Sequence, residues 1–349
     1  MKLGILYVGV SDGTCRHRAD ALRELGHAVD HVVSGAPRAF WAKQLDRVGR
    51  RLGVWLDLDG ANRRIRTALA GRPYDLLWID KGLWIEPGTL REARRHRPGL
   101  QIVAYSPDDM MHPANQSPNY LRGLPLYDLH VTTKSYNVAE LGRLGARDVL
   151  FIDNAYEPAA HRPLELDDAE RRRYETPVGF VGTFETDRAN HMLRLAERGI
   201  QVTIWGSEWE KFHESHPNLR LRREALGGLD YARAVNGARI NLAFLRKAAR
   251  DLQTTRSVEI PACGAFMLAE RTDEHLRLFA EGREAEFFSS FEELERKCRY
   301  YLEHEAERAR VAAAGLERCR RGGYGNAERL RGVLAYLARR SPALGSGPG

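Results

Sequence analysis

Short apolar runs rich in β-branched residues alternate with amphipathic segments of helical period along most of this chain of 349 residues. Such alternation is typical of βαβ units, in which a helix connects two strands of a parallel sheet. The predicted strands are 3–9, 27–33, 74–80, 101–106, 128–133 and 148–155 in the first half, and 177–184, 200–206, 219–223, 240–246, 265–270 and 284–290 in the second. The helices predicted between them include 15–26, 89–97, 137–145, 188–199, 229–238 and 291–319. The pattern therefore predicts an α/β protein with parallel sheets.

Two successive α/β halves account for the length of the chain, which exceeds the usual size of one hydrophobic core. We expect the first domain to span 1–154 and the second to span 177–322. The stretch 155–176 between them is polar, punctuated by proline and without strand periodicity, and is predicted to be a linker. A helix at 323–340 and a flexible tail at 341–349 complete the chain. Pairs of such domains place ligands in the cleft between them.

Composition excludes several classes of protein. The chain has 43% hydrophobic and 29% charged residues, which is typical of a soluble globular protein, and no apolar run long enough to span a bilayer. Four scattered cysteines without a CxxC pair indicate reduced thiols in a cytoplasmic protein, and the first residues do not resemble a signal peptide. The formal charge of +7 comes from dispersed arginines without an aromatic-interleaved basic stripe, so we expect no nucleic-acid partner.

One basic, amphipathic segment at residues 38–56 allows two interpretations. It could rest on the anionic inner face of a membrane, which would make the protein peripheral and offer it a lipid-linked acceptor. It could equally be a helix that covers the sheet and turns a solvated face outward.

A metal site is not expected. Asp57 and Asp59 form a DxD pair of the kind that some sugar transferases use to hold Mn²⁺, but two acidic residues occur easily by chance beside a helix. The two histidines of HESH at 213–216 lack the spacing of a zinc-protease helix. GxGxxG and GxxxxGK[ST] motifs do not occur in the sequence.

The stretch DLQTTRSVEIPACGAFMLAE at 251–270 is the most informative. Because Pro261 suits the first turn of a helix, we expect a short helix that begins near 258–260 and ends near Gly264. Two hydroxyls and a guanidinium, those of Thr254, Thr255 and Arg256, precede that helix and would converge with its backbone N–H groups on a diphosphate.

Two carboxylates flank this loop. Glu259 can accept two hydrogen bonds from the vicinal diol of a ribose, and Asp251 could hold a second polyol. The alternative is that Glu259 is only a first-turn residue favoured by the helix dipole. The loop follows a predicted strand, and open parallel sheets bind their ligands at that end.

This stretch resembles the donor-site segment of GT-B glycosyltransferases with an E-x7-E motif, which here reads Asp251-x7-Glu259 followed by PACG. More specifically, the chain resembles the CgeB-like, spore-maturation-type group over residues 1–335, through RSVEIPACGAFML, the later YYLEHEAER, and YSPDDM with DLHVTTKS. The resemblance implies a GT-B fold, in which two Rossmann-like parallel-sheet domains, an acceptor domain and a donor domain, face each other across a cleft. It also implies that the helix at 323–340 crosses back to the first domain.

The resemblance implies that Glu259 binds the nucleotide ribose and Asp251 the donor sugar. Related enzymes neutralise the diphosphate with a G-R-x4-K arrangement. Here Gly182 is followed by Thr183, and Arg188 occupies the lysine position, so one cation is missing. The other donor-side candidates are Gly206, Arg246, Lys247, Thr254, Thr255 and Arg256. Arg246, Lys247 or Arg256 could supply the missing cation.

In the first domain, Asp108, Asp109 and His112 follow a predicted strand and would bind the acceptor or the transferred sugar. The alternative for them is a turn with an Asx cap. The other acceptor-side candidates, at the ends of neighbouring strands or in the first loop, are Asp12, Gly13, Arg16, Asp80, Lys81 and Lys134.

The resemblance implies a hexosyltransferase-type enzyme that needs no cofactor or metal and moves a sugar from a nucleotide diphosphate sugar to an unknown acceptor (a glycan, a lipid-linked molecule or a small molecule). It favours retention of anomeric configuration; an inverting enzyme would need a base among Asp108, Asp109 and His112. Two alternatives remain, a GT-B-fold nucleotide-sugar epimerase and a non-catalytic sugar-binding or surface-assembly protein.

Overall fold

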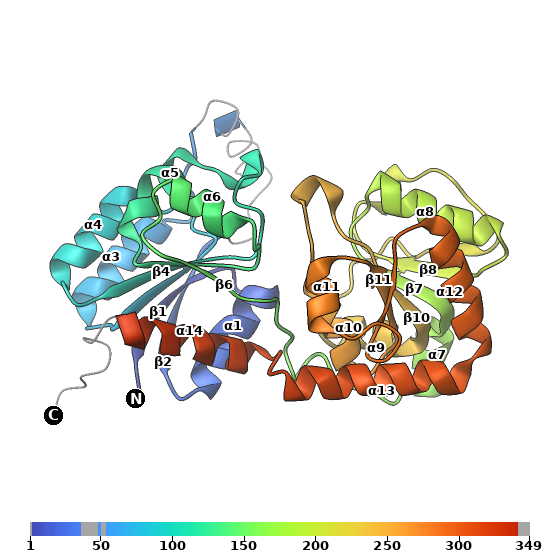
Figure 1. The fold of residues 1–349 in the computed structure, drawn as a ribbon. Coiled ribbons are helices and arrows are strands. Elements are labelled where there is room, and N and C mark those ends of the chain that lie inside the picture. Colours follow the sequence, from blue (N-terminus) through green and yellow to red (C-terminus); the bar gives the residue numbers. More distant parts are fainter. Residues whose placement is uncertain (1, 36–47, 50–53, 341–349) are drawn as a thin grey trace. The chain divides into compact units, whose positions relative to one another are not determined.

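The computed structural model describes residues 2–35, 48–49 and 54–340, and it divides into two compact units (Figure 1). Unit 1 runs to Asp153 and takes up the chain again at Asn326. Unit 2 comprises Asn154–Gly325. Each unit has its own hydrophobic core and its own sheet.

Unit 1 contains a six-stranded parallel sheet in the order β2-β1-β3-β4-β5-β6. The strands are β1 (Gly4–Gly9), β2 (Ala28–Val33), β3 (Leu76–Asp80), β4 (Gln101–Ser106), β5 (Leu129–Thr132) and β6 (Val149–Phe151). The helices are α1 (Gly13–Glu24), α3 (Ala61–Gly71), α4 (Pro87–His96), α5 (Pro118–Gly123), α6 (Asn137–Arg143) and α14 (Asn326–Arg340). Every residue of β3 is buried, because α1 and α14 cover one face of the sheet and α3 and α4 cover the other.

Unit 2 repeats this architecture in the order β12-β11-β10-β7-β8-β9, again parallel throughout. Its strands are β7 (Thr176–Val181), β8 (Val202–Trp205), β9 (Leu219–Leu221), β10 (Ala238–Ala243), β11 (Met267–Glu270) and β12 (Glu286–Phe288). Its helices are α7 (Asp168–Tyr174), α8 (Thr186–Glu197), α9 (Gly228–Gly237), α10 (Arg256–Ala262), α11 (Asp273–Leu278), α12 (Phe291–Glu303) and α13 (Glu305–Arg321). Helices α8 and α12 pack in one core cluster, and α9, α10 and α11 pack in the other.

The predicted fold class is confirmed: all twelve strands form, and each lies in a parallel sheet with helical connections. The stretch 155–176 differs from the predicted linker, because it belongs to unit 2. Tyr156 and Tyr174 are buried in the core of that unit, and α7 begins with a capping box at Asp167. The sequence did not predict this packing, because the stretch is otherwise polar and only these two tyrosines are buried in the core.

Two helices also differ from the prediction. Helix α10 begins at Arg256, earlier than expected, and Pro261 lies in its last turn. A helix of seven residues tolerates this, because only one intrahelical hydrogen bond is lost, the one to the Ser257 carbonyl. The single helix predicted at 291–319 is broken at His304, whose backbone is not helical, into α12 and α13.

Most of the segment 38–56 and all of the tail 341–349 lie outside the described residues, so the predicted membrane contact and flexibility concern parts that the structure does not describe. Within the described ranges, no helix combines the length and the apolar character that crossing a membrane requires.

Candidate functional site

The order of strands in unit 2 reverses between β7 and β10: β8 and β9 follow on one side, β11 and β12 on the other. In open α/β sheets, ligands bind beyond the carboxyl ends of the strands at such a switch point. Two loops leave from this point, one from Gly182 to α8 and the other from Phe244 to α10. All of the donor-side residues predicted from the sequence lie in or beside these loops, or at the end of β8.

Glycines let the loops after β7 and β8 touch. The Gly182 carbonyl accepts a hydrogen bond from Trp209 Nε1 at 2.8 Å, and its N–H donates to the Trp205 carbonyl at 2.8 Å. A Cβ atom on Gly206 would lie 1.8 Å from the Gly182 oxygen, and the φ of Gly206 is +155°. Only glycine fits there, so Gly206 shapes the site through the backbone. Thr183 is exposed and shares a hydrogen bond of 3.2 Å with Ser207.

Three guanidinium groups gather at the carboxyl ends of β7 and β10. The side chain of Arg188 is only 4% exposed, its Nη2 lies 2.8 Å from Glu185 Oε2, and its Nε has no hydrogen-bond partner among the described residues. Burial lowers the pKa of Arg188, and the nearby charges of Arg256 and Arg246 lower it further. Arg256 donates from Nε to the Val181 carbonyl. Because like charges in one place repel, this cluster is suited to a bound anion.

The loop after β10 is held by carboxylates. Arg246 Nε lies 3.1 Å from Oδ2 of Asp251, whose side chain is completely buried. Lys247 Nζ lies 2.9 Å from Glu270 Oε1, and the other oxygen of Glu270 accepts from the Leu245 N–H at 2.8 Å. Asp251, which the sequence predicts to hold a polyol, is therefore packed against Arg246, and its carboxylate is not exposed to solvent.

The start of α10 is fixed by a chain of hydrogen bonds. Ser257 Oγ accepts from the Thr254 N–H at 3.0 Å and lies 2.7 Å from His275 Nε2. The other ring nitrogen of His275 lies 2.6 Å from the Glu270 carbonyl. Thr254 and Thr255 are half-buried in the loop before α10.

Glu259 lies in the first turn of α10 and is 7% exposed. Its Oε1 lies 3.7 Å from His161 Nε2. Burial raises the pKa of Tyr231, and the adjacent Glu259 carboxylate raises it further. The sequence does not reveal His161 and Tyr231 as neighbours of Glu259, because they come from distant parts of the chain and no motif connects them.

In unit 1, Lys81 and Asp108 lie just after the neighbouring strands β3 and β4, and Lys81 Nζ is 2.6 Å from Asp108 Oδ2. Asp80 is not an exposed candidate: its carboxylate is buried and accepts from Tyr7 at 2.6 Å and from Arg18 at 2.7 Å. It therefore anchors Arg18 below the strand ends.

Asp109 is buried, and its Oδ1 accepts from the Met111 N–H at 2.9 Å and from Asn137 Nδ2 at 3.0 Å. This is the Asx-type turn that was the alternative interpretation. His112 is half-buried in that turn, and Lys134 is buried.

The first loop of unit 1 is accessible. Asp12 and Gly13, at the start of α1, are exposed, and Gly13 has a φ of +54°. The side chain of Arg16 is 69% exposed and pairs with Asp20 at 3.4 Å.

Asp57 caps α3, since its carboxylate accepts from the N–H groups of Ala61 and Asn62. Asp59 accepts from the Gly35 N–H at 2.7 Å. Over the part of the chain that is described, no group of three His, Cys, Asp or Glu side chains is arranged to hold a metal ion.

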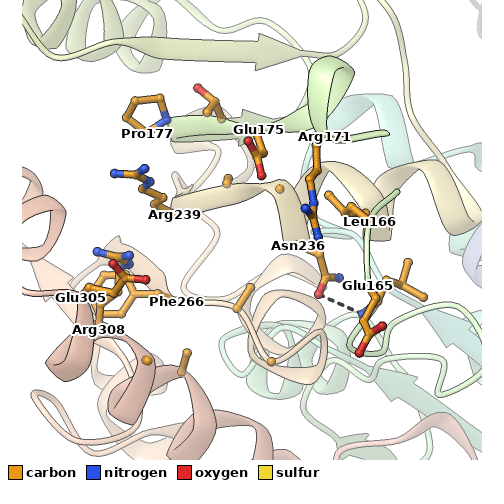
Figure 2. Close-up of a pocket in the computed structure, with 18 residues that line it drawn as sticks. Glu165, Leu166, Arg171, Glu175, Pro177, Asn236, Arg239, Phe266, Glu305 and Arg308 are labelled. Carbon is orange, nitrogen blue, oxygen red and sulfur yellow. Dashed lines mark hydrogen bonds between the residues drawn. The ribbon is translucent and has the colours of Figure 1, made fainter. Parts of the chain in front are cut away.

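Two cavities in unit 2 lie at opposite ends of its sheet. One of about 420 Å³ lies beside Arg188 and Lys247, at the carboxyl ends of the strands. A larger one of about 890 Å³ lies at the amino ends, where Figure 2 shows Arg239 and Arg308 near Glu305. Its six charged lining residues are balanced in sign: Arg171, Arg239, Arg308, Glu165, Glu175 and Glu305. Size alone would favour the larger cavity as the ligand-binding site. The topology of the sheet favours the smaller one, because ligands bind at the carboxyl ends of parallel strands.

Comparison with known proteins finds one family model that matches part of the chain and several solved structures with a similar fold. A family model described as "Glycosyl transferase-like" matches residues 188–335, which is less than half of the chain. No curated protein matches the sequence.

Three solved structures illustrate the likeness of fold. HepE from Anabaena, solved with UDP and glucose, has a TM-score of 0.65 at 13% identity over 97% of this chain and 100% of that one. Sucrose-phosphate synthase from Thermosynechococcus elongatus has a TM-score of 0.62 at 12% identity over 97% and 100%. A Listeria monocytogenes protein described as a UDP-N-acetylglucosamine 2-epimerase has a TM-score of 0.54 at 12% identity over 97% and 96%. At such identities the likeness concerns the fold, and the fold of this chain is GT-B, with two α/β units built on parallel sheets.

Proposed function

We propose that this protein is a glycosyltransferase of the CgeB-like group that moves a sugar from a nucleotide diphosphate sugar to an acceptor. The observation that carries the proposal is the cluster of Arg188, Arg246 and Arg256 at the β7/β10 switch point, with Glu259 on the same loop system. The matched family segment includes all four residues, and HepE, of the same fold, was solved with UDP and with UDP-glucose.

The diphosphate of the donor would lie against the arginine cluster. Arg188 offers an Nε without a partner among the described residues, and the first turn of the twelve-residue helix α8 offers backbone N–H groups at the same strand end. Negative charge builds up on the departing nucleotide during glycosyl transfer. Pre-arranged cations would stabilise that charge without a metal ion.

Glu259 would accept hydrogen bonds from the two ribose hydroxyls. A carboxylate has several acceptor sites and no donor, so it suits a vicinal diol and repels phosphate. This divides the roles in the variant E-x7-E motif. Glu259 would recognise the nucleoside, while Asp251 holds Arg246 in place and touches the sugar little or not at all.

Unit 1 would bind the acceptor. Its accessible polar residues at strand ends are Asp108 with Lys81, together with Asp12 and Arg16 at the first loop. We infer retention of configuration from the motif, with the departing phosphate helping to deprotonate the acceptor. If the enzyme inverts, Asp108 or His112 is the base, because Asp109 already accepts backbone and amide hydrogen bonds.

A donor panel tests this proposal. The protein is incubated with UDP-, GDP- and dTDP-sugars, with and without a mixture of sugar, glycan and lipid acceptors, and nucleotide release is measured. Acceptor-dependent release that Arg188→Met abolishes is the expected result. Conversion of the donor into an epimer without an acceptor would make the protein an epimerase, and binding without turnover would make it a non-catalytic sugar-binding protein.

A further inference from the structure

Behind Glu259 lies a histidine that the sequence does not connect with it. His161 is 5% exposed and sits in a tight turn, where the Glu157 N–H donates to its Nδ1 at 3.0 Å. The His161 N–H closes the same turn by donating to the Glu157 carbonyl at 2.7 Å. The ring of Tyr231 packs edge-on against the imidazole, with centroids 5.5 Å apart and an angle of 87° between the ring planes.

The turn determines where the imidazole carries its proton. Because Nδ1 accepts a hydrogen bond from a backbone N–H, it cannot be protonated in this arrangement, and the neutral ring keeps its proton at Nε2. That nitrogen lies 3.7 Å from Oε1 of Glu259. The separation exceeds that of a direct hydrogen bond, so the N–H acts on the carboxylate as an oriented dipole.

The His161 Nε2–H group and the Glu259 carboxylate are both shielded from solvent. Both side chains are nearly buried, His161 at 5% and Glu259 at 9% side-chain exposure. Interactions of this kind are stronger in a buried site than in water. An N–H that faces Oε1 favours one orientation of the carboxylate and leaves lone pairs of both oxygens for hydroxyl donors.

We propose that His161 is a positioning residue that holds the Glu259 carboxylate in the orientation that accepts the ribose hydroxyls of the donor. His161 would thereby strengthen selection for ribonucleotide over dideoxyribonucleotide ligands. This inference rests on the proposed function, since it assigns a second residue to the same nucleotide site.

Two substitutions of His161 test the roles of Nδ1 and Nε2 separately. His161→Asn keeps an acceptor near the position of Nδ1, so the turn with Glu157 is preserved, and removes the donor that faces Glu259. His161→Gln places an amide donor near the position of Nε2. His213→Asn, at an exposed histidine of the same unit, is the matched control.

The test is isothermal titration of the full chain with whichever of UDP, GDP and ADP binds the wild type most tightly, and with its 2′,3′-dideoxy form. We expect His161→Asn to weaken binding of the ribonucleotide about tenfold, by analogy with metal sites, where loss of a side chain that orients a ligand costs about 10–100-fold. Binding of the dideoxy form should stay within about twofold, because it has no ribose hydroxyls for Glu259 to accept. His161→Gln should recover most of the loss, and His213→Asn should bind like the wild type.

Equal losses for the ribonucleotide and its dideoxy form would overturn the inference, because they indicate general damage to the site. An unchanged ribonucleotide affinity in His161→Asn would overturn it as well, while leaving the proposed function intact. If the wild type binds none of the three nucleotides, the proposed function fails, and this inference fails with it.

Discussion

Nε of Arg246 lies 3.1 Å from Oδ2 of Asp251, and the carboxylate is completely buried while the guanidinium is partly exposed. Asp251 is therefore the partner of a cation beside the proposed diphosphate site. The short side chain of aspartate suffices for such a contact within the loop.

We expect Asp251→Asn to weaken binding of the free nucleoside diphosphate, because Arg246 would lose the partner that orients it. Stability should fall by about 1 kcal/mol, since Arg246 can still turn toward water. Titration with UDP and urea denaturation measure both effects. If Asp251 contacted the sugar directly, the variant would bind UDP like the wild type and lose only affinity or turnover for the UDP-sugar.

Arg188→Met should lower the affinity for a nucleoside diphosphate without lowering stability. Its charge is buried near two other arginines, and its partner Glu185 is partly exposed, so that carboxylate stays solvated without Arg188. Replacing Arg188 by an apolar side chain of similar length should therefore raise the melting temperature or leave it unchanged. Nucleoside diphosphate affinity should fall at least about tenfold, because hydrogen bonds to charged groups typically contribute 1.5–3 kcal/mol. Arg198→Ala, at an exposed arginine just after α8, is the control and should change neither quantity. A destabilised Arg188→Met protein with normal affinity would show that Arg188 serves the fold alone.

Gly206→Ala should destabilise unit 2 by more than about 3 kcal/mol, because the new Cβ would lie 1.8 Å from the Gly182 oxygen and the backbone has a positive φ. Gly227→Ala is matched to it, since a Cβ at Gly227 meets no atom within 4 Å and its φ is negative. Chemical denaturation of both variants makes the comparison. Similar stabilities would mean that the loops after β7 and β8 separate easily.

His130 in β5 should make unit 1 sensitive to acid. Burial lowers its pKa from 6.5 to about 3, and neither ring nitrogen has a hydrogen-bond partner among the described residues. The unfolded chain therefore binds a proton below pH 6.5 that the folded chain does not, so the free energy of unfolding falls as the pH falls toward 3.

The loss attributable to His130 should be about 2 kcal/mol between pH 6.5 and about pH 5, at about 1.4 kcal/mol per pH unit. His130→Phe keeps an aromatic ring against Tyr127 and should remove that part of the pH dependence. Urea denaturation across this pH range measures the slope. Identical slopes for variant and wild type would show that His130 is not the group that titrates.

Much of the architecture could be predicted from the sequence, because buried parallel strands leave continuous apolar runs such as that of β3. The packed stretch around Tyr156 and Tyr174 could not, since its polar composition hides two buried anchors. The start of α10 was misplaced because Pro261 suits a first turn in general but is also tolerated in the last turn of so short a helix.

Only some residues of the candidate site could be assigned a role from the sequence, for a related reason. Residue type and loop position brought Arg188, Arg256 and Glu259 to one end of one sheet. They could not reveal that Asp109 accepts from the backbone of its own turn, or that Asp80 is paired with Arg18. Those partners come from packing, and His161 beside Glu259 likewise depends on a contact between distant segments.

The central claim is that the β7/β10 switch point of unit 2 binds a nucleoside diphosphate through Arg188 and Glu259. Isothermal titration of the wild type and of the Arg188→Met/Glu259→Ala double variant with UDP, GDP and ADP tests it most directly. We predict that the wild type binds at least one nucleotide with a stoichiometry of one, and that the folded double variant binds none measurably. Equal binding by the two proteins, or a folded wild type that binds no nucleotide, would contradict the claim.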